Sequence, residues 1–120
     1  MQDIEKCEIV EITQGAFYLG ESNQNYSEGY LELKPHTSLT IHNRLGGYEN
    51  LTQVKNSCVM IIFNKPEGVS YKLNKGDKLR IKPKGVWHIH SNPFDKPSLT
   101  HWYFEGDIRK VIEDIRKNKK

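Results

Sequence analysis

The stretch from Gly76 to Asn92 carries a histidine in a setting suited to chemistry. A short alternating run over Lys78–Ile81 is broken by Pro83, and a second strand-like run then carries His88. A histidine just past such a corner is held on rigid strand backbone, where it can serve as a ligand or as a base. His88 is therefore the first candidate for a functional side chain.

The spacing of this stretch resembles the second signature motif of the cupin superfamily. In that family the motif has a glycine, a spacer and then the pattern P-x-G-x-x-H-x-x-x-N. Gly76, Pro83, Gly85, His88 and Asn92 occupy all of its fixed positions. The resemblance implies a single cupin jelly-roll β-barrel.

The first cupin motif is present in a degenerate form. His42 matches the first histidine of that motif, and Glu49 matches its carboxylate. Arg44 stands where the second histidine is expected, and Asn56 replaces the closing glycine. Since Asn tolerates positive φ better than most residues, Asn56 is predicted to keep the tight turn. The resemblance covers roughly residues 29–104.

The resemblance implies a metal centre at His42, Glu49 and His88. Most metal-binding cupins use three histidines and one glutamate, and two of those histidines and the glutamate remain here. Such a set suits Fe(II) with open coordination positions, and Mn, Ni or Zn almost as well, so we expect a divalent transition metal of unknown identity. The predicted function is that of a metal-dependent cupin enzyme, of the dioxygenase, lyase or isomerase type, acting on a small polar or anionic metabolite.

Strand alternation adds further residues to the predicted pocket. Residues two apart on a strand share a face, so His90 is expected beside His88, where it would move protons or supply a third imidazole. Arg44 cannot be a metal ligand because its guanidinium stays protonated, and it would instead orient a substrate carboxylate or phosphate. Gln53 and Trp102 are expected to complete the substrate site.

A metal-free pocket is the alternative. Arg44 beside Glu49 would form a bidentate ion pair and occupy the carboxylate that a metal needs. Many metal-free cupins bind sugars or nucleotide sugars, so the same residues would then bind or isomerise a sugar-type ligand. A non-catalytic binding or structural dimer is the third possibility.

The elements that position these residues are short strands. Runs rich in Val, Ile, Tyr and Thr, separated by Gly, Pro and Asn, recur over residues 6–104 and predict an all-β sandwich or barrel. The longest and most apolar run is Leu51–Phe63, and its segment Cys58–Phe63 is predicted to line the core. We expect a single domain, with the β-barrel over residues 1–106 and a short basic helix over residues 107–120.

The C-terminal segment has a different pattern from the strands. Asp107 is predicted to cap a helix whose apolar residues fall at i, i+3, i+4 and i+7. Such a stripe usually packs on its own barrel, but for so small a barrel we expect it to join two subunits of a homodimer.

Composition and charge limit which binding partners and which cellular location we expect for the protein. The 120-residue chain has a net charge of +3, and the six basic and three acidic residues from Asp107 onward account for it. With no basic patch elsewhere, nucleic-acid binding is not expected. No apolar run approaches the ~20 residues of a membrane helix and the N-terminus has no signal-peptide core, so we expect a cytoplasmic protein with no membrane partner. Cys7 and Cys58 are predicted to be buried free thiols.

Overall fold

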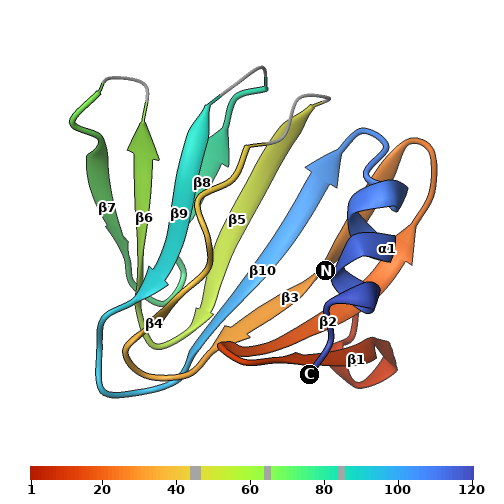
Figure 1. The fold of residues 1–120 in the computed structure, drawn as a ribbon, viewed down its shortest axis with the longest axis horizontal. Helices are drawn as coiled ribbons and strands as arrows, with labels where there is room; N and C mark the ends of the chain where they lie inside the picture. The colour runs from red at the N-terminus through yellow and green to blue at the C-terminus, as the bar shows by residue number, and fades with distance from the viewer. Residues whose placement is uncertain (44–46, 64–65, 84–85) are drawn as a thin grey trace.

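Two antiparallel β-sheets and a C-terminal helix make up the protein (Figure 1). The computed structural model describes residues 1–43, 47–63, 66–83 and 86–120. The elements are a 3₁₀ turn η1 (Ile4–Lys6), β1 (Glu8–Ile12), β2 (Gly15–Ser22), β3 (Tyr26–Leu33), β4 (Thr37–Ser38), β5 (Tyr48–Lys55), β6 (Cys58–Phe63), β7 (Val69–Leu73), β8 (Lys78–Ile81), β9 (Trp87–Asn92), β10 (Ser98–Glu105) and α1 (Arg109–Lys117).

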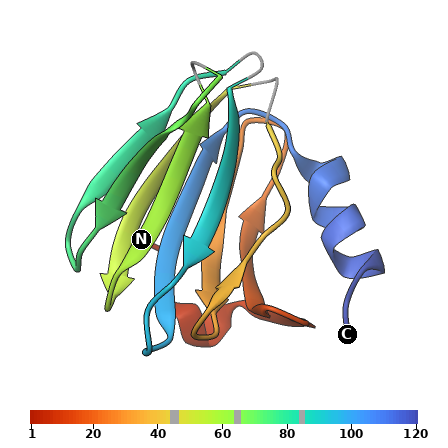
Figure 2. The same cartoon turned by 60° about the vertical axis from the view of Figure 1, so that its left-hand side comes forward.

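The larger sheet has the strand order β1-β2-β3-β10-β5-β8, and the smaller has β4-β9-β6-β7. All of the pairings are antiparallel, and most of them join strands that are distant in the sequence. In both views of the molecule, α1 lies at the opposite end from β6 and β7 (Figure 1 and Figure 2). The all-β fold class is confirmed.

The hydrophobic core lies between the two sheets. Leu33, Leu51 and Phe104 of the larger sheet are almost fully buried, as is Met60 of the smaller sheet. Every second residue of β6 is buried and the residues between are half-buried, as expected for a strand with one face toward the core. Burial of these side chains is the main favourable term that holds the two sheets together.

The prediction that Leu51–Phe63 forms one continuous run is wrong. The structure divides it at Asn56 and Ser57, and places β5 in the larger sheet and β6 in the smaller one. Asn56 has φ 56°, so it makes the tight turn predicted for it, and its side-chain amide donates to the Pro97 carbonyl oxygen at 2.7 Å. Left-handed backbone ends a strand, and hydrophobicity alone does not show that the chain changes sheet at that point.

Two fixed residues of the Gly76–Asn92 stretch have structural tasks. Gly76 has φ 92°, a conformation that favours glycine, and turns the chain into β8. Asn92 is fully buried, and its side-chain amide donates to the carbonyl oxygens of Leu33, Lys34 and Lys96. These contacts tie the end of β9 to the end of β3. Gly85, also matched by the motif, lies outside the described residues.

Helix α1 begins two residues after the predicted capping residue. Asp107 is not the N-cap, but its carboxylate accepts a hydrogen bond from the backbone N–H of Arg109 at 3.1 Å. The buried Ile112 and Ile108 join the core cluster of the barrel, so the apolar stripe packs on its own chain. At the far end of the helix, Arg116 forms an ion pair with Glu8 of β1 at 2.8 Å.

Cys58 is a buried free thiol, as predicted, whereas Cys7 is only partly buried. Within the described part of the chain, no helix combines the length and the hydropathy that crossing a membrane requires.

Candidate metal centre

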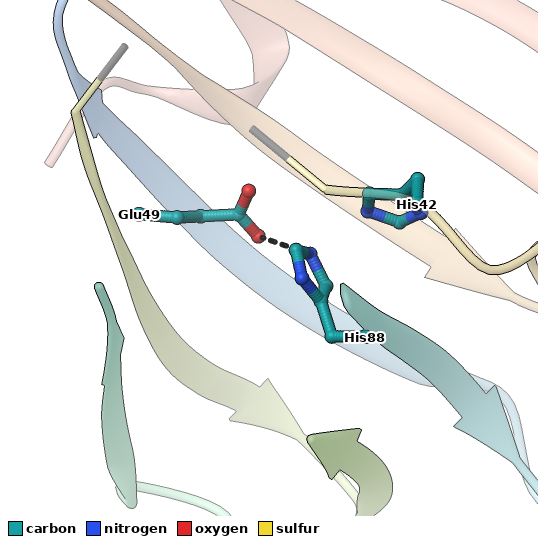
Figure 3. A group of neighbouring side chains, drawn as sticks. All are labelled: His42, Glu49 and His88. Atoms are coloured by element: carbon teal, nitrogen blue, oxygen red, sulfur yellow. Dashed lines mark ion pairs between the residues drawn. The ribbon is translucent and has the colours of Figure 1, made fainter. Parts of the chain in front are cut away.

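Three side chains from different parts of the fold meet between the sheets (Figure 3). His42 follows β4, His88 lies on β9 of the same sheet, and Glu49 lies on β5 of the opposite sheet. One potential ligand atom from each lies within 4.8 Å of the others. The structure thus brings together the three residues that were predicted as metal ligands.

Backbone pairing holds the two histidines side by side. The N–H of His42 donates to the His88 carbonyl oxygen at 3.0 Å, and the N–H of His88 donates to the His42 carbonyl oxygen at 2.8 Å. The ring centroids are 4.2 Å apart, with an angle of 70° between the planes. This isolated bridge places both imidazoles on the face of the smaller sheet that looks toward Glu49.

Hydrogen bonds to backbone carbonyls fix the tautomer of both rings. Nδ1 of His42 lies 2.9 Å from the Thr40 carbonyl oxygen, and Nδ1 of His88 lies 3.1 Å from that of Val86. A carbonyl oxygen only accepts, so Nδ1 carries the proton in each ring and Nε2 carries the lone pair when the imidazole is neutral. This arrangement, with one nitrogen held by a carbonyl and the other able to ligate, is usual for metal-binding histidines.

The residues present fit a metal ion. Nε2 of His88 is buried, has no hydrogen-bond partner among the described residues, and lies 3.7 Å from the Glu49 carboxylate. A buried nitrogen lone pair without a partner is unfavourable, because it has lost water without replacing it. A cation held between His88 and Glu49 would satisfy this lone pair and offset the carboxylate charge.

His90 has the opposite tautomer from the two candidate ligands. Its Nε2 lies 3.2 Å from the Thr100 hydroxyl, which donates its own proton to Oε1 of Gln53 at 2.6 Å. His90 Nε2 must therefore carry the proton and donate it to Thr100. Burial, together with the charges of the His42 and His88 imidazoles, lowers the pKa of His90 to about 3. A base this weak is poorly matched to proton transfer at neutral pH, so the predicted role of His90 as a proton carrier gains no support.

Gln53 lies at the centre of a buried hydrogen-bond network. Its exposed fraction is 1%, and its amide nitrogen donates to the carbonyl oxygens of Lys55 and Asn56 and to the Ser98 hydroxyl. Its oxygen accepts from Thr100 and from the Cys58 thiol. Because these contacts use the whole amide, Gln53 has little capacity left for a substrate.

A cavity adjoins two of the three candidate ligands, His42 and Glu49. The described residues that line it are Phe17, Leu31, Leu39, His42, Glu49, Leu51, His90, Trp102, Phe104, Ile108, Val111, Ile112 and Ile115. Trp102 was predicted to line the substrate site, and the structure places it in this wall. Gln53 is not among the lining residues. Arg44, predicted to hold an anionic substrate group, lies outside the described residues.

Comparison with known proteins connects this geometry to a fold. No protein-family model matches the sequence, and no curated protein matches it. An RmlC-like cupin from Shewanella frigidimarina NCIMB 400 superposes with a TM-score of 0.75 at 16% identity, over 92% of this chain and 94% of that one. A double-stranded β-helix protein from Klebsiella pneumoniae subsp. pneumoniae MGH 78578 gives 0.75 at 14% identity over 90% of each chain. The formate complex of Lactobacillus farciminis oxalate decarboxylase gives 0.76 at 19% identity, over 88% of this chain and 32% of that one.

The protein has the cupin fold. Within it, the candidate metal ligands lie on the inner faces of the two sheets, whereas His101 and His36 do not line the cavity. His101 points to the outer face of the larger sheet, where it contacts Glu28 at 2.8 Å. His36 is exposed and pairs with Asp95.

Sequence reasoning missed the wall that α1 contributes to the cupin cavity. The amphipathic stripe was recognised, but its expected partner was a second subunit rather than the cavity of its own barrel. The sequence also contained no signal for the buried Nε1–H of Trp102, which has no acceptor among the described residues.

Proposed function

We propose that this cupin binds one divalent transition metal at His42, Glu49 and His88 and acts on a small molecule in the adjoining cavity. One observation carries the proposal: the buried Nε2 of His88 has no hydrogen-bond partner among the described residues and lies 3.7 Å from the Glu49 carboxylate. The Nε2 of His42 has the same tautomer and belongs to the same group.

The chain's own groups define what such a centre would do. Two neutral imidazoles and one carboxylate offset part of a divalent charge and leave coordination positions for water or substrate. A metal bound there acts as a Lewis acid that polarises a substrate oxygen or lowers the pKa of water. The carbonyls of Thr40 and Val86 hold the two rings in the ligating tautomer, and the cavity wall is mainly apolar. Iron, manganese, nickel and zinc all suit this ligand set.

Metal titration of stripped protein tests the proposal. Calorimetry with Zn(II), Mn(II), Ni(II) and anaerobic Fe(II), checked by elemental analysis, should give one metal per chain. His88→Ala should lose at least 100-fold in metal affinity, since it removes a direct ligand and even an outer-shell contact is worth ~10–100-fold. His36→Ala is the matched control, because His36 is exposed and pairs with Asp95 away from the site. Failure of all four metals to bind the wild-type protein would overturn the proposal.

A metal-free binding protein is the second candidate, and Arg44 is the observation that favours it. An arginine, whose side chain is a permanent cation, stands at the motif position where a ligating histidine is expected. Arg44→His distinguishes the two: a gain in metal affinity supports retained ligand geometry. No metal binding in either protein would favour the metal-free function.

We also propose that the protein forms a homodimer. The proposed interface is the outer face of the smaller sheet and not α1. The outer face of the smaller sheet carries Trp87, which is 47% exposed, next to the half-buried Phe63, Ile61 and Ile89. An apolar cluster on a solvent face favours self-association. Light scattering should give a dimer mass for the wild-type protein and a monomer mass for Trp87→Ser. A wild-type monomer would exclude the homodimer.

A further inference from the structure

The cavity beside the candidate metal centre has an unusual division between polar and apolar walls. Its polar described groups are the side chains of His42, Glu49 and His90, and Trp102 contributes an indole ring. All the remaining described lining residues are aliphatic or phenylalanine side chains, and no described lysine or arginine lines it. A strongly polar or dianionic ligand would leave much of its surface without hydrogen bonds against these walls.

Trp102 contributes a hydrogen-bond donor that the protein does not use. Trp102 is 9% exposed, and its indole Nε1–H is buried without an acceptor among the described residues. The ring lies against Gly29, where an added Cβ would be 2.7 Å from its Cζ2 atom. A buried tryptophan N–H normally finds a partner, so this donor indicates that an acceptor comes from a bound molecule.

We propose that the cavity binds a small, mainly hydrocarbon molecule with a carbonyl-type oxygen, and that the Trp102 N–H donates to that oxygen. This inference rests on the proposed function, because it defines the substrate class of the same site. The aliphatic wall accommodates the hydrocarbon part, and His42 and Glu49 place the metal centre beside it. The ligand is therefore less polar than the sequence predicted.

Helix α1 sets the size limit. The cavity volume is about 50 Å³, enough for roughly 3–5 water molecules or a ligand of similar size. Val111 and Ile115 of α1 line the cavity and are only partly buried. The helix follows Gly106, which has φ 144°, and its other end is fixed by the exposed Arg116–Glu8 ion pair. Longer ligands therefore require α1 to move or its side chains to be shortened.

NMR of the indole N–H tests the inference without any assay of turnover. Uniformly ¹⁵N-labelled protein would be prepared metal-free and Zn(II)-loaded and titrated with 2-butanone, and in parallel with oxalate. Trp87→Phe removes one of the two indole signals and thereby assigns the other to Trp102. In the wild-type protein the Trp87 signal is the control, because Trp87 lies on the outer face. The Trp102 signal should shift downfield with 2-butanone in a saturable manner and should not move with oxalate.

Two variants refine the test. Trp102→Phe keeps an aromatic ring but removes the donor, and should weaken 2-butanone binding about two- to tenfold, the value of one hydrogen bond, when followed through the Ile112 methyl signals. Val111→Ala should raise the affinity for 2-hexanone relative to 2-butanone. Lys110→Ala, an exposed change on the same helix, should leave this ratio unchanged.

The outcomes separate the inference from the proposed function. One zinc per chain with no ketone-induced shift of the indole signal would overturn the inference and leave the metal centre intact. A ketone-induced shift without metal binding would overturn the proposed function while supporting the assigned ligand chemistry. A shift with oxalate but not with 2-butanone would refute the inference in favour of a polar, anionic ligand.

Discussion

Acidifying the metal-free protein should reveal the energetic cost of burying His90. This side chain is 4% exposed, and its pKa falls from 6.5 to about 3 in the folded protein. Between these two pH values the unfolded chain binds a proton on His90 and the folded chain does not. The free energy of unfolding must therefore decrease as the pH falls from about 6.5 to about 3, and this contribution levels off below that range.

The magnitude follows from the size of the pKa shift. Each pKa unit corresponds to about 1.4 kcal/mol, so the full change contributes roughly 3–5 kcal/mol. That is a large share of the ~5–15 kcal/mol that stabilises a typical domain. We expect His90 alone to remove a substantial part of the protein's stability by pH 4.

Urea unfolding followed by circular dichroism at pH 7, 6, 5 and 4, with EDTA present, measures this effect. His90→Gln is the comparison, because its amide can donate to Thr100 but does not titrate. The wild-type protein should lose more stability per pH unit than the variant, by up to about 1.4 kcal/mol. Parallel stability curves for the two proteins would refute the reasoning, whatever the offset between them at pH 7.

Three further predictions concern the surroundings of the site. Replacing Gln53 by Leu should lower the free energy of unfolding by about 3 kcal/mol in urea titrations, because several buried partners lose their hydrogen bonds; a loss below 1 kcal/mol would contradict the network. Burial raises the pKa of the Cys58 thiol to about 11, so a thiol reagent at pH 8 should label Cys7 first and Cys58 only on unfolding, and equal labelling rates would contradict this. Long-range ¹H–¹⁵N spectra should show the Nδ1–H tautomer for His42 and His88, and an Nε2–H tautomer in either ring would remove the main support for the metal site.

Residues with local structural tasks were the easiest to predict. Gly76 and Asn56 both adopt positive φ, as glycine and asparagine do most readily, and both turns fall where the motifs place them. The apolar run Cys58–Phe63 was predicted to line the core, and every second residue of β6 is buried there. These features depend on the backbone preferences of one or two residues, so a sequence pattern is sufficient to find them.

The candidate site was predictable only in part. The cupin resemblance implied His42, Glu49 and His88 as ligands, and the structure brings the three together. Parity also placed Gln53 and His90 on the same faces, yet both lie in a buried network with Thr100. Alternation gives the face of a side chain but not its neighbours, which come from strands elsewhere in the chain.

The sequence by itself determined most of the strands and turns, because alternation of side chains and the positions of glycine and asparagine act over a few residues, and the spacing of one stretch resembled a cupin motif. Only the tertiary structure decided which polar side chain is a candidate ligand and which is held in the core. His88 and His90 are two residues apart on one strand, but the first bonds a backbone carbonyl and the second a threonine hydroxyl on β10. Those partners determine the tautomer of each ring. They are set by how the sheets and α1 pack, which no short stretch of sequence encodes.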